Sequence, residues 1–182
     1  MVTVFLANGF EEMEGLAPVD LLRRAGVKVQ TAAVNEDGGK WVTGSHGVTV
    51  ACDINAKEVT EEEMQMLVLP GGLPGTNHLD ASAEVDHWLK VASKKGIFIA
   101  AICAAPSVLG NRGLLDGRRA VSFPGFEPKG ATICKGEGVV RDGQYITARG
   151  AGVCLDFGFK LIECLCGEEK ALQIKEGIQC QR

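Results

Sequence analysis

Short apolar runs alternate with amphipathic stretches along the whole chain. Apolar residues recur at helical spacing in five segments, which predicts helices over residues 11–25, 85–95, 106–115, 153–166 and 168–175. Short apolar or β-branched runs bounded by Gly, Pro or Asp predict strands over residues 2–7, 27–34, 66–69, 96–102, 120–122, 138–141 and 145–147. Residues 41–43 and 48–51 are predicted to form a small hairpin, and Asp142-Gly143 a turn.

The strands are apolar on both sides and are separated by helices. This pattern predicts an α/β domain with a mostly parallel sheet that helices cover on both faces. The length of 182 residues suits one domain over residues 1–182. In such a sheet, ligands bind beyond the carboxyl ends of the strands, so chemistry is expected near residues 8–14, 70–75, 103–106 and 149–152.

Composition excludes several classes of protein. Hydrophobic residues make up 46% and charged residues 23%, which argues against a disordered chain. The net charge of −4, without a basic block, predicts that the protein does not bind nucleic acid. We expect neither a signal peptide nor a membrane span, since the first apolar run is short and no run approaches about 18 residues.

The cysteines and histidines suggest no metal or disulfide framework. The seven cysteines are odd in number and contain no Cys-x-x-Cys pair, so reduced thiols in the cytoplasm are the simplest interpretation. The three histidines, His46, His78 and His87, lack ligand spacing and are predicted to lie on the surface. No cofactor or metal is expected.

Cys103 is the strongest candidate for a reactive group. It follows the apolar strand over 96–102 and precedes Pro106, which suits the first turn of a helix. A cysteine at such a strand-to-helix corner has the geometry of a nucleophile elbow, and the helix start is expected to favour its thiolate. The alternative is a small buried cysteine that packs as an apolar residue.

Glu14 is the candidate partner carboxyl. The acidic residues Glu11, Glu12 and Glu14 would suit the first turn of a solvated helix. Pro18 removes the N–H that would bond the Glu14 carbonyl, which predicts a distorted helix there. If Glu14 faces the thiol, burial would raise its pKa and let it move protons near neutral pH.

Two glycine-rich segments are expected to border the same site. The glycines at 71 and 72 expose backbone N–H groups that could form an oxyanion hole with the N–H of Ala104, although a plain glycine turn explains them equally well. Arg149 and Gly150 open a later helix and could form another wall, or a simple helix cap. Neither segment has the spacing of a phosphate or dinucleotide loop.

Taken together these motifs resemble the ThiJ/PfpI superfamily, and more narrowly its Parkinson-disease-protein deglycase and bacterial ThiJ-type branch. The resemblance rests on Gly-x-Glu-Glu-x-Glu after the first strand, Leu-Pro-Gly-Gly, Ala-Ala-Ile-Cys-Ala-Ala-Pro and Arg-Gly-Ala-Gly, and runs from Met1 to about Ile174. It implies a three-layer flavodoxin-like sandwich that forms a homodimer, with Cys103 as the reactive thiol, Glu14 hydrogen-bonded to it, and Gly72 and Ala104 as oxyanion donors.

The resemblance also implies cofactor-independent activities. Relatives are associated with conversion of methylglyoxal to lactate (glyoxalase III), removal of glycation adducts, oxidative-stress protection through cysteine sulfinate, and chaperone activity. Small reactive aldehydes or glycated adducts are therefore the expected partners.

Three positions depart from the family pattern. Phe123 stands where many relatives carry a histidine near the thiol, so Glu14 would have to do the proton work. Ala104 stands where the protease-like branch has histidine, which argues against a protease. His46 stands where close relatives have an arginine that reaches the neighbouring subunit's site, and we expect it to carry a weaker, pH-dependent positive charge.

Three functions remain open at this point. The leading hypothesis is an enzyme in which Cys103 adds to a 2-oxoaldehyde and Glu14 shuttles the proton. The alternative is a non-enzymatic sensor or chaperone that acts through Cys103 sulfinate. A scaffold role would leave Cys103 without function.

Overall fold

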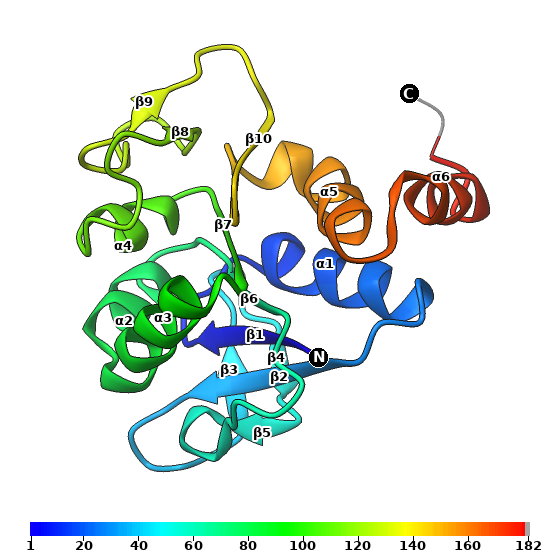
Figure 1. Ribbon diagram of the computed structural model, residues 1–182. Coiled ribbons are helices and arrows are strands. Elements are labelled where there is room, and N and C mark those ends of the chain that lie inside the picture. Colours follow the sequence, from blue (N-terminus) through cyan, green and yellow to red (C-terminus); the bar gives the residue numbers. More distant parts are fainter. Residues whose placement is uncertain (181–182) are drawn as a thin grey trace.

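A computed structural model of the chain describes residues 1–180 (Figure 1). Its centre is a seven-stranded sheet in the order β10-β11-β7-β6-β1-β2-β5. All neighbouring strands are parallel except β10, which runs antiparallel to β11 at one edge. The strands are β1 (Val2–Ala7), β2 (Val29–Val34), β5 (Ile54–Asn55), β6 (Met66–Leu69), β7 (Phe98–Ile102), β10 (Val139–Asp142) and β11 (Tyr145–Ala148).

Two small sheets lie outside the central one. Strands β3 (Trp41–Thr43) and β4 (Thr49–Ala51) form the antiparallel hairpin that the sequence predicts. Strands β8 (Arg119–Ala120) and β9 (Thr132–Ile133) form a short parallel pair.

Helices cover both faces of the sheet (Figure 1). On one face α1 packs against α5, and α6 packs against α5 in turn, whereas α2, α3 and α4 cover the other face. The helices are α1 (Glu12–Arg24), α2 (Gly75–Ala81), α3 (Ala83–Lys95), α4 (Pro106–Gly110), α5 (Cys154–Cys166) and α6 (Glu168–Gly177), with 3₁₀ turns η1 (Ala56–Glu58) and η2 (Ala151–Val153). Within residues 1–180 no helix has the length and apolar character needed to cross a membrane.

Strand β1 shows why the sheet needs two helical layers. Val2, Val4 and Leu6 belong to the core on the α1 and α5 side, and Phe5 and Ala7 to the core on the α3 side. Side chains alternate between the faces of a strand, so an apolar residue at almost every position requires cover on both sides. The predicted α/β architecture is therefore confirmed.

The boundaries of several elements differ from prediction. Helix α4 ends at Gly110 rather than 115, and the chain continues in turns over residues 111–117. The short elements α2, β5 and β9 were not expected, and the tight turn falls at residues 143–144, one residue later than predicted. Helix α1 runs without interruption through Pro18.

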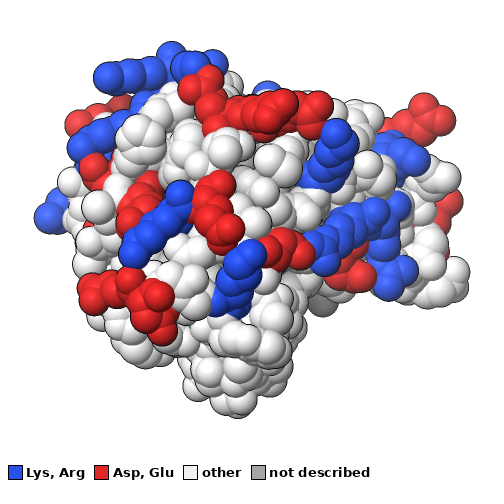
Figure 2. Space-filling model, turned by 90° about the horizontal axis from the view of Figure 1, so that it is seen from below, with Lys and Arg blue, Asp and Glu red and all other residues white. Residues whose placement is uncertain are grey.

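The face of the molecule in Figure 2 carries charges of both signs. Figure 2 views the molecule from the β5 edge of the sheet, where acidic and basic side chains alternate. Several of them pair, among them Lys28 with Glu63 at 2.8 Å and Arg23 with Asp53 at 2.8 Å. Mixed charges of this kind do not form the cationic stripe that phosphates require.

Candidate active site

Cys103 occupies a strained corner between β7 and α4. Its φ is +63°, a left-handed conformation that is uncommon for residues other than glycine. The backbone holds it on both sides, because its N–H donates to the Ala148 carbonyl at 2.9 Å and its carbonyl accepts from the Phe123 N–H at 2.8 Å. This is the predicted elbow, and strain of this kind persists only where surrounding contacts enforce it.

Helix α1 brings the Glu14 carboxyl to the same corner. The side chain of Glu14 is buried, with 1% of the residue exposed. Glu11 caps the helix by accepting from the Glu14 N–H at 2.8 Å, which fixes the first turn. The Oε2 atom of Glu14 accepts from the Gly71 N–H at 2.9 Å, whereas Oε1 has no hydrogen-bond partner within residues 1–180.

Gly71 is the point at which Glu14 and Cys103 meet. A Cβ at this position would lie 2.6 Å from Glu14 Oε2 and 2.7 Å from Cys103 Cβ. A side chain of any size would therefore force the two apart. Position 71, two residues beyond the end of β6, therefore requires glycine so that the backbone can lie against both the Glu14 carboxyl and Cys103.

Gly72 and Ala104 place backbone N–H groups beside the thiol. Both lie within hydrogen-bonding reach of the Cys103 side chain. Gly72 has φ +89°, and a Cβ there would lie 2.4 Å from the Glu11 nitrogen, so this position requires glycine. Two N–H groups that converge beside a nucleophile are the arrangement that stabilises an oxyanion.

Burial controls the proton affinities of the pair. Loss of solvent raises the pKa of Glu14 to about 7, although interaction with Cys103 and the N–H groups of Gly71 and Ala151 partly offsets this. Burial, with the nearby Glu14 charge, also raises the pKa of Cys103 to about 12, against the opposing N–H groups of Ala104 and Gly72. This direction runs against the expectation that the helix start favours the thiolate, because burial and the Glu14 charge favour the neutral thiol.

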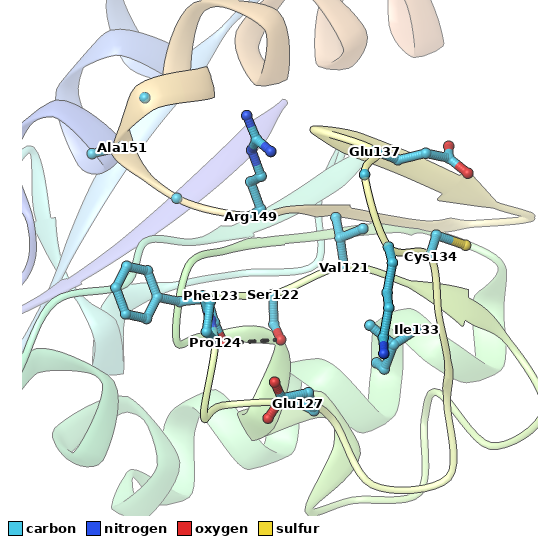
Figure 3. Close-up of a pocket in the computed structure, with 14 residues that line it drawn as sticks. Val121, Ser122, Phe123, Pro124, Glu127, Ile133, Cys134, Glu137, Arg149 and Ala151 are labelled. Carbon is cyan, nitrogen blue, oxygen red and sulfur yellow. Dashed lines mark hydrogen bonds between the residues drawn. The ribbon is translucent and has the colours of Figure 1, made fainter.

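A cavity of about 610 Å³ lies beside this corner (Figure 3). Phe123 and Ala151 lie at one end and Cys134 and Glu137 at the other, with Arg149 between them. The predicted wall residues Arg149, Gly150 and Phe123 all line this cavity rather than the Cys103 side chain itself. The Phe123 ring is half exposed, and the residue contacts the elbow through its backbone N–H.

His46 lies apart from the thiol, at the tip of the β3–β4 hairpin. Its ring Nδ1 lies 2.9 Å from Glu12 Oε2, and the backbone N–H groups of His46 and Val48 donate to Glu12 Oε1 at 2.7 and 3.3 Å. The pKa of Glu12 falls to about 2 despite its desolvation, because His46 and these N–H groups favour the carboxylate, and the pKa of His46 is raised by the same contact. All three histidines are exposed, as predicted.

Glu11, Glu12 and His46 form a group that the sequence did not reveal. Their ligand atoms lie within 4.8 Å of one another, close enough to hold a cation. The hydrogen bonds already made by Glu12 explain the cluster as the anchor that ties the hairpin to α1. We assign it no ligand.

Three further features were missed at the level of sequence. Cys134 lines the cavity, and buried Cys154 lies near enough to Glu14 and Cys103 for their charges to raise its pKa, after the larger effect of burial. The cavity itself draws on segments around residues 121, 133 and 150. Nothing in the local sequence links these segments, so only the tertiary structure could identify the cavity.

Comparison with known proteins identifies the family to which the chain belongs. Residues 1–164 match the DJ-1/PfpI family. The chain is 39% identical to Protein dj-1beta of Drosophila melanogaster over 178 residues, covering 96% of this chain and 94% of that protein. It is 33% identical over 159 residues to a protein named a deglycase from Pyrococcus abyssi, covering 83% and 90% of the two chains. The crystal structure of Drosophila DJ-1beta superposes with a TM-score of 0.93 at 37% identity, covering 100% of this chain and 98% of that one. The chain therefore belongs to the DJ-1/PfpI family, and its fold is the flavodoxin-like sandwich that the motifs implied.

Proposed function

We propose that the protein is a cofactor-independent cysteine enzyme that converts 2-oxoaldehydes such as methylglyoxal to 2-hydroxy acids, or removes related glycation adducts. The observation that carries this proposal is the buried Glu14 carboxyl beside Cys103 on its strained corner. The deglycase name of the Pyrococcus relative supports the same class of substrate.

In the first step Cys103 adds to the aldehyde carbon. Because burial disfavours a free thiolate, Glu14 takes the thiol proton as the C–S bond forms, and a carboxyl whose pKa is about 7 suits this role. The carbonyl oxygen becomes an oxyanion that the N–H groups of Gly72 and Ala104 stabilise. Glu14 then returns its proton to this oxygen and leaves a neutral thiohemiacetal.

In the second step the proton moves between the two carbons. Glu14 removes the hydrogen of the former aldehyde carbon as a proton and delivers a proton to the neighbouring ketone carbon, while the proton of the thiohemiacetal hydroxyl passes to the former ketone oxygen. The first carbon is thereby oxidised to a thioester and the second reduced to an alcohol, so no external oxidant or reductant is needed. Water then hydrolyses the thioester, releases the 2-hydroxy acid and restores the Cys103 thiol.

The test is lactate formation from methylglyoxal without glutathione. Wild-type protein is expected to form lactate, and Cys103→Ser to lose at least a hundredfold in kcat/KM. Cys166→Ser, at an exposed cysteine outside the site, serves as the matched control and is expected to keep wild-type activity. Equal rates for Cys103→Ser and wild type would contradict the proposal.

A second candidate function uses the unpartnered Glu14 Oε1. A protonated carboxyl oxygen beside the thiol, with the Gly72 and Ala104 N–H groups, could stabilise a Cys103 sulfinate formed by peroxide. Such a sensor or chaperone predicts oxidation that stops at sulfinate on Cys103 alone, which peptide mass spectrometry after mild peroxide would detect. Uniform oxidation of all seven cysteines would contradict it.

Assembly and location remain predictions. We expect a homodimer, and sedimentation equilibrium would report its mass. The exposed apolar side chains of Met13, Val48 and Leu155 suit burial in such an interface. The cytoplasmic location rests on the seven cysteines, all of which carry free thiols in the structure.

A further inference from the structure

We infer that the cavity beside Cys103 receives the side group of the substrate, so that the enzyme prefers 2-oxoaldehydes with a bulky apolar group to methylglyoxal. This inference rests on the proposed function and names the substrate class of the same site.

The cavity shares its walls with the reacting groups. Phe123, at one end of the cavity, donates its N–H to the carbonyl of Cys103 at 2.8 Å. Ala151, at the same end, has its backbone N–H near enough to the Glu14 carboxyl to lower the pKa of that group slightly, although it makes no hydrogen bond of normal geometry to it. These contacts place the end of the cavity formed by Phe123 and Ala151 (Figure 3) next to the Cys103 corner, so we expect a molecule bound covalently to Cys103 to extend into this space.

The size of the cavity exceeds what methylglyoxal needs. A volume of about 610 Å³ lies within the range of pockets that enclose larger organic ligands. Methylglyoxal carries only a methyl group on its ketone carbon and would leave most of this volume unfilled. An aryl or branched alkyl group would displace more water from the walls and so gain more hydrophobic stabilisation.

The chemistry of the walls favours an apolar side group. Val121, Phe123, Pro124 and Ile133 supply apolar surface. The acidic Glu137 at the far end is paired with Arg119 at 2.8 Å, and Glu127 accepts from the Gly125 N–H at 3.1 Å. These carboxylates are therefore already engaged. The cationic side chains of Arg149 and Lys135 also line the cavity, and apolar atoms supply most of its surface.

Phe123 adds to this preference. A histidine at position 123 would put a polar ring at one end of the cavity, whereas the half-exposed Phe123 ring makes this end apolar. Sites that differ by a few apolar contacts discriminate between substrates by about tenfold to a hundredfold. We therefore expect at least a tenfold higher kcat/KM for phenylglyoxal than for methylglyoxal.

The test compares initial rates of mandelate formation from phenylglyoxal with lactate formation from methylglyoxal. Ile133→Trp fills the cavity at its far end, and is expected to lower the ratio of the two kcat/KM values at least tenfold. Ile178→Trp makes the same change beyond the end of α6, away from the cavity, and is expected to leave the ratio at its wild-type value. A wild-type preference for methylglyoxal, or an unchanged ratio in Ile133→Trp, would overturn the inference.

A binding measurement separates this inference from the proposed function. Acetophenone, which lacks the aldehyde, is titrated into Cys103→Ser protein while the methyl resonances of Val121 are followed by NMR. Saturable shifts that Ile133→Trp abolishes would support an apolar binding cavity. Absent shifts would overturn it, even if methylglyoxal is turned over. If wild type forms neither product, the proposed function fails and the substrate assignment falls with it.

Discussion

Glu14 has a buried carboxyl group of which only one oxygen accepts a hydrogen bond from the described residues. One oxygen accepts from Gly71 at 2.9 Å, while the other has no partner within the described chain. An isolated buried charge is costly, so the protein binds a proton at Glu14 more tightly than the unfolded chain does. Burial of the Glu14 carboxylate lowers the stability of the fold. The same burial raises the pKa of this carboxyl to a value at which it can exchange protons near neutral pH.

The cost of burying the Glu14 charge predicts that Glu14→Gln changes the free energy of unfolding in a pH-dependent way. The pKa of Glu14 rises from an ordinary 4.5 to about 7 on folding, so its stabilising contribution is complete below pH 4.5 and is lost as pH rises through 7. At pH 8 the variant should be more stable than wild type by up to about 3 kcal/mol, whereas at pH 4 the two should be similar. Urea unfolding across this range measures the difference. A difference that does not vary with pH would contradict the raised pKa.

Sequence alone could point to the candidate residues of the site but not to their protonation. Cys103 and Ala104 follow from local rules, because a strand that meets a helix-starting proline must turn there, and the Gly-Gly pair marks a nearby turn with exposed backbone N–H groups. The pKa of Cys103 does not follow from such rules. It depends on burial and on Glu14, which lies 89 positions earlier in the chain and reaches the thiol only through the sheet topology.

At the level of elements, the β3–β4 hairpin depends on one carboxylate of α1. Glu12 accepts from the N–H groups of His46 and Val48 and contacts the His46 ring, although His46 itself is largely exposed. The hairpin lies outside the central sheet, so these hydrogen bonds and the contact of its Thr43 with Asn8 and Gly9 set its position.

Glu12→Ala should therefore loosen the hairpin tip. Hydrogen bonds to a charged group are worth about 1.5–3 kcal/mol, so the His46 and Val48 amides should exchange with solvent at least tenfold faster. Hydrogen exchange followed by NMR measures this, with the β1 amides expected to be unchanged. Glu62→Ala, at an exposed acidic residue distant in sequence, is the matched control. Wild-type exchange rates at both amides in Glu12→Ala would show that the hairpin is held by other contacts.

Elements with strong periodic patterns were predicted well and the short ones were not. Strands β1, β6 and β7 are continuous apolar runs, and the cap at Ser82 and the left-handed Gly96 define α3. The two-residue strands β5 and β9 form because neighbouring backbone is available to pair with them, which local sequence does not encode.

At the scale of the whole molecule, the fold gathers the site at the carboxyl ends of parallel strands. Strands β1, β6 and β7 are adjacent in the sheet, and Glu14, Gly71 and Cys103 follow them in the chain. Adjacent parallel strands end at the same edge, so the sheet order alone brings these three groups together. The apolar pattern predicted the parallel sheet, but the cavity depends on loops whose meeting point only the tertiary structure reveals.

The most direct test of the proposed mechanism adds methylglyoxal to the Glu14→Gln variant and measures both the adduct on Cys103 and the lactate formed. In the proposed mechanism Glu14 takes the thiol proton and then moves the proton between the two carbons, so this variant should form the Cys103 adduct more slowly than wild type while lactate formation falls at least a hundredfold. Native mass spectrometry with peptide mapping detects the adduct, and a lactate assay on the same sample detects turnover. Wild-type lactate formation by Glu14→Gln, or an adduct on a cysteine other than Cys103, would contradict the division of roles between the two residues.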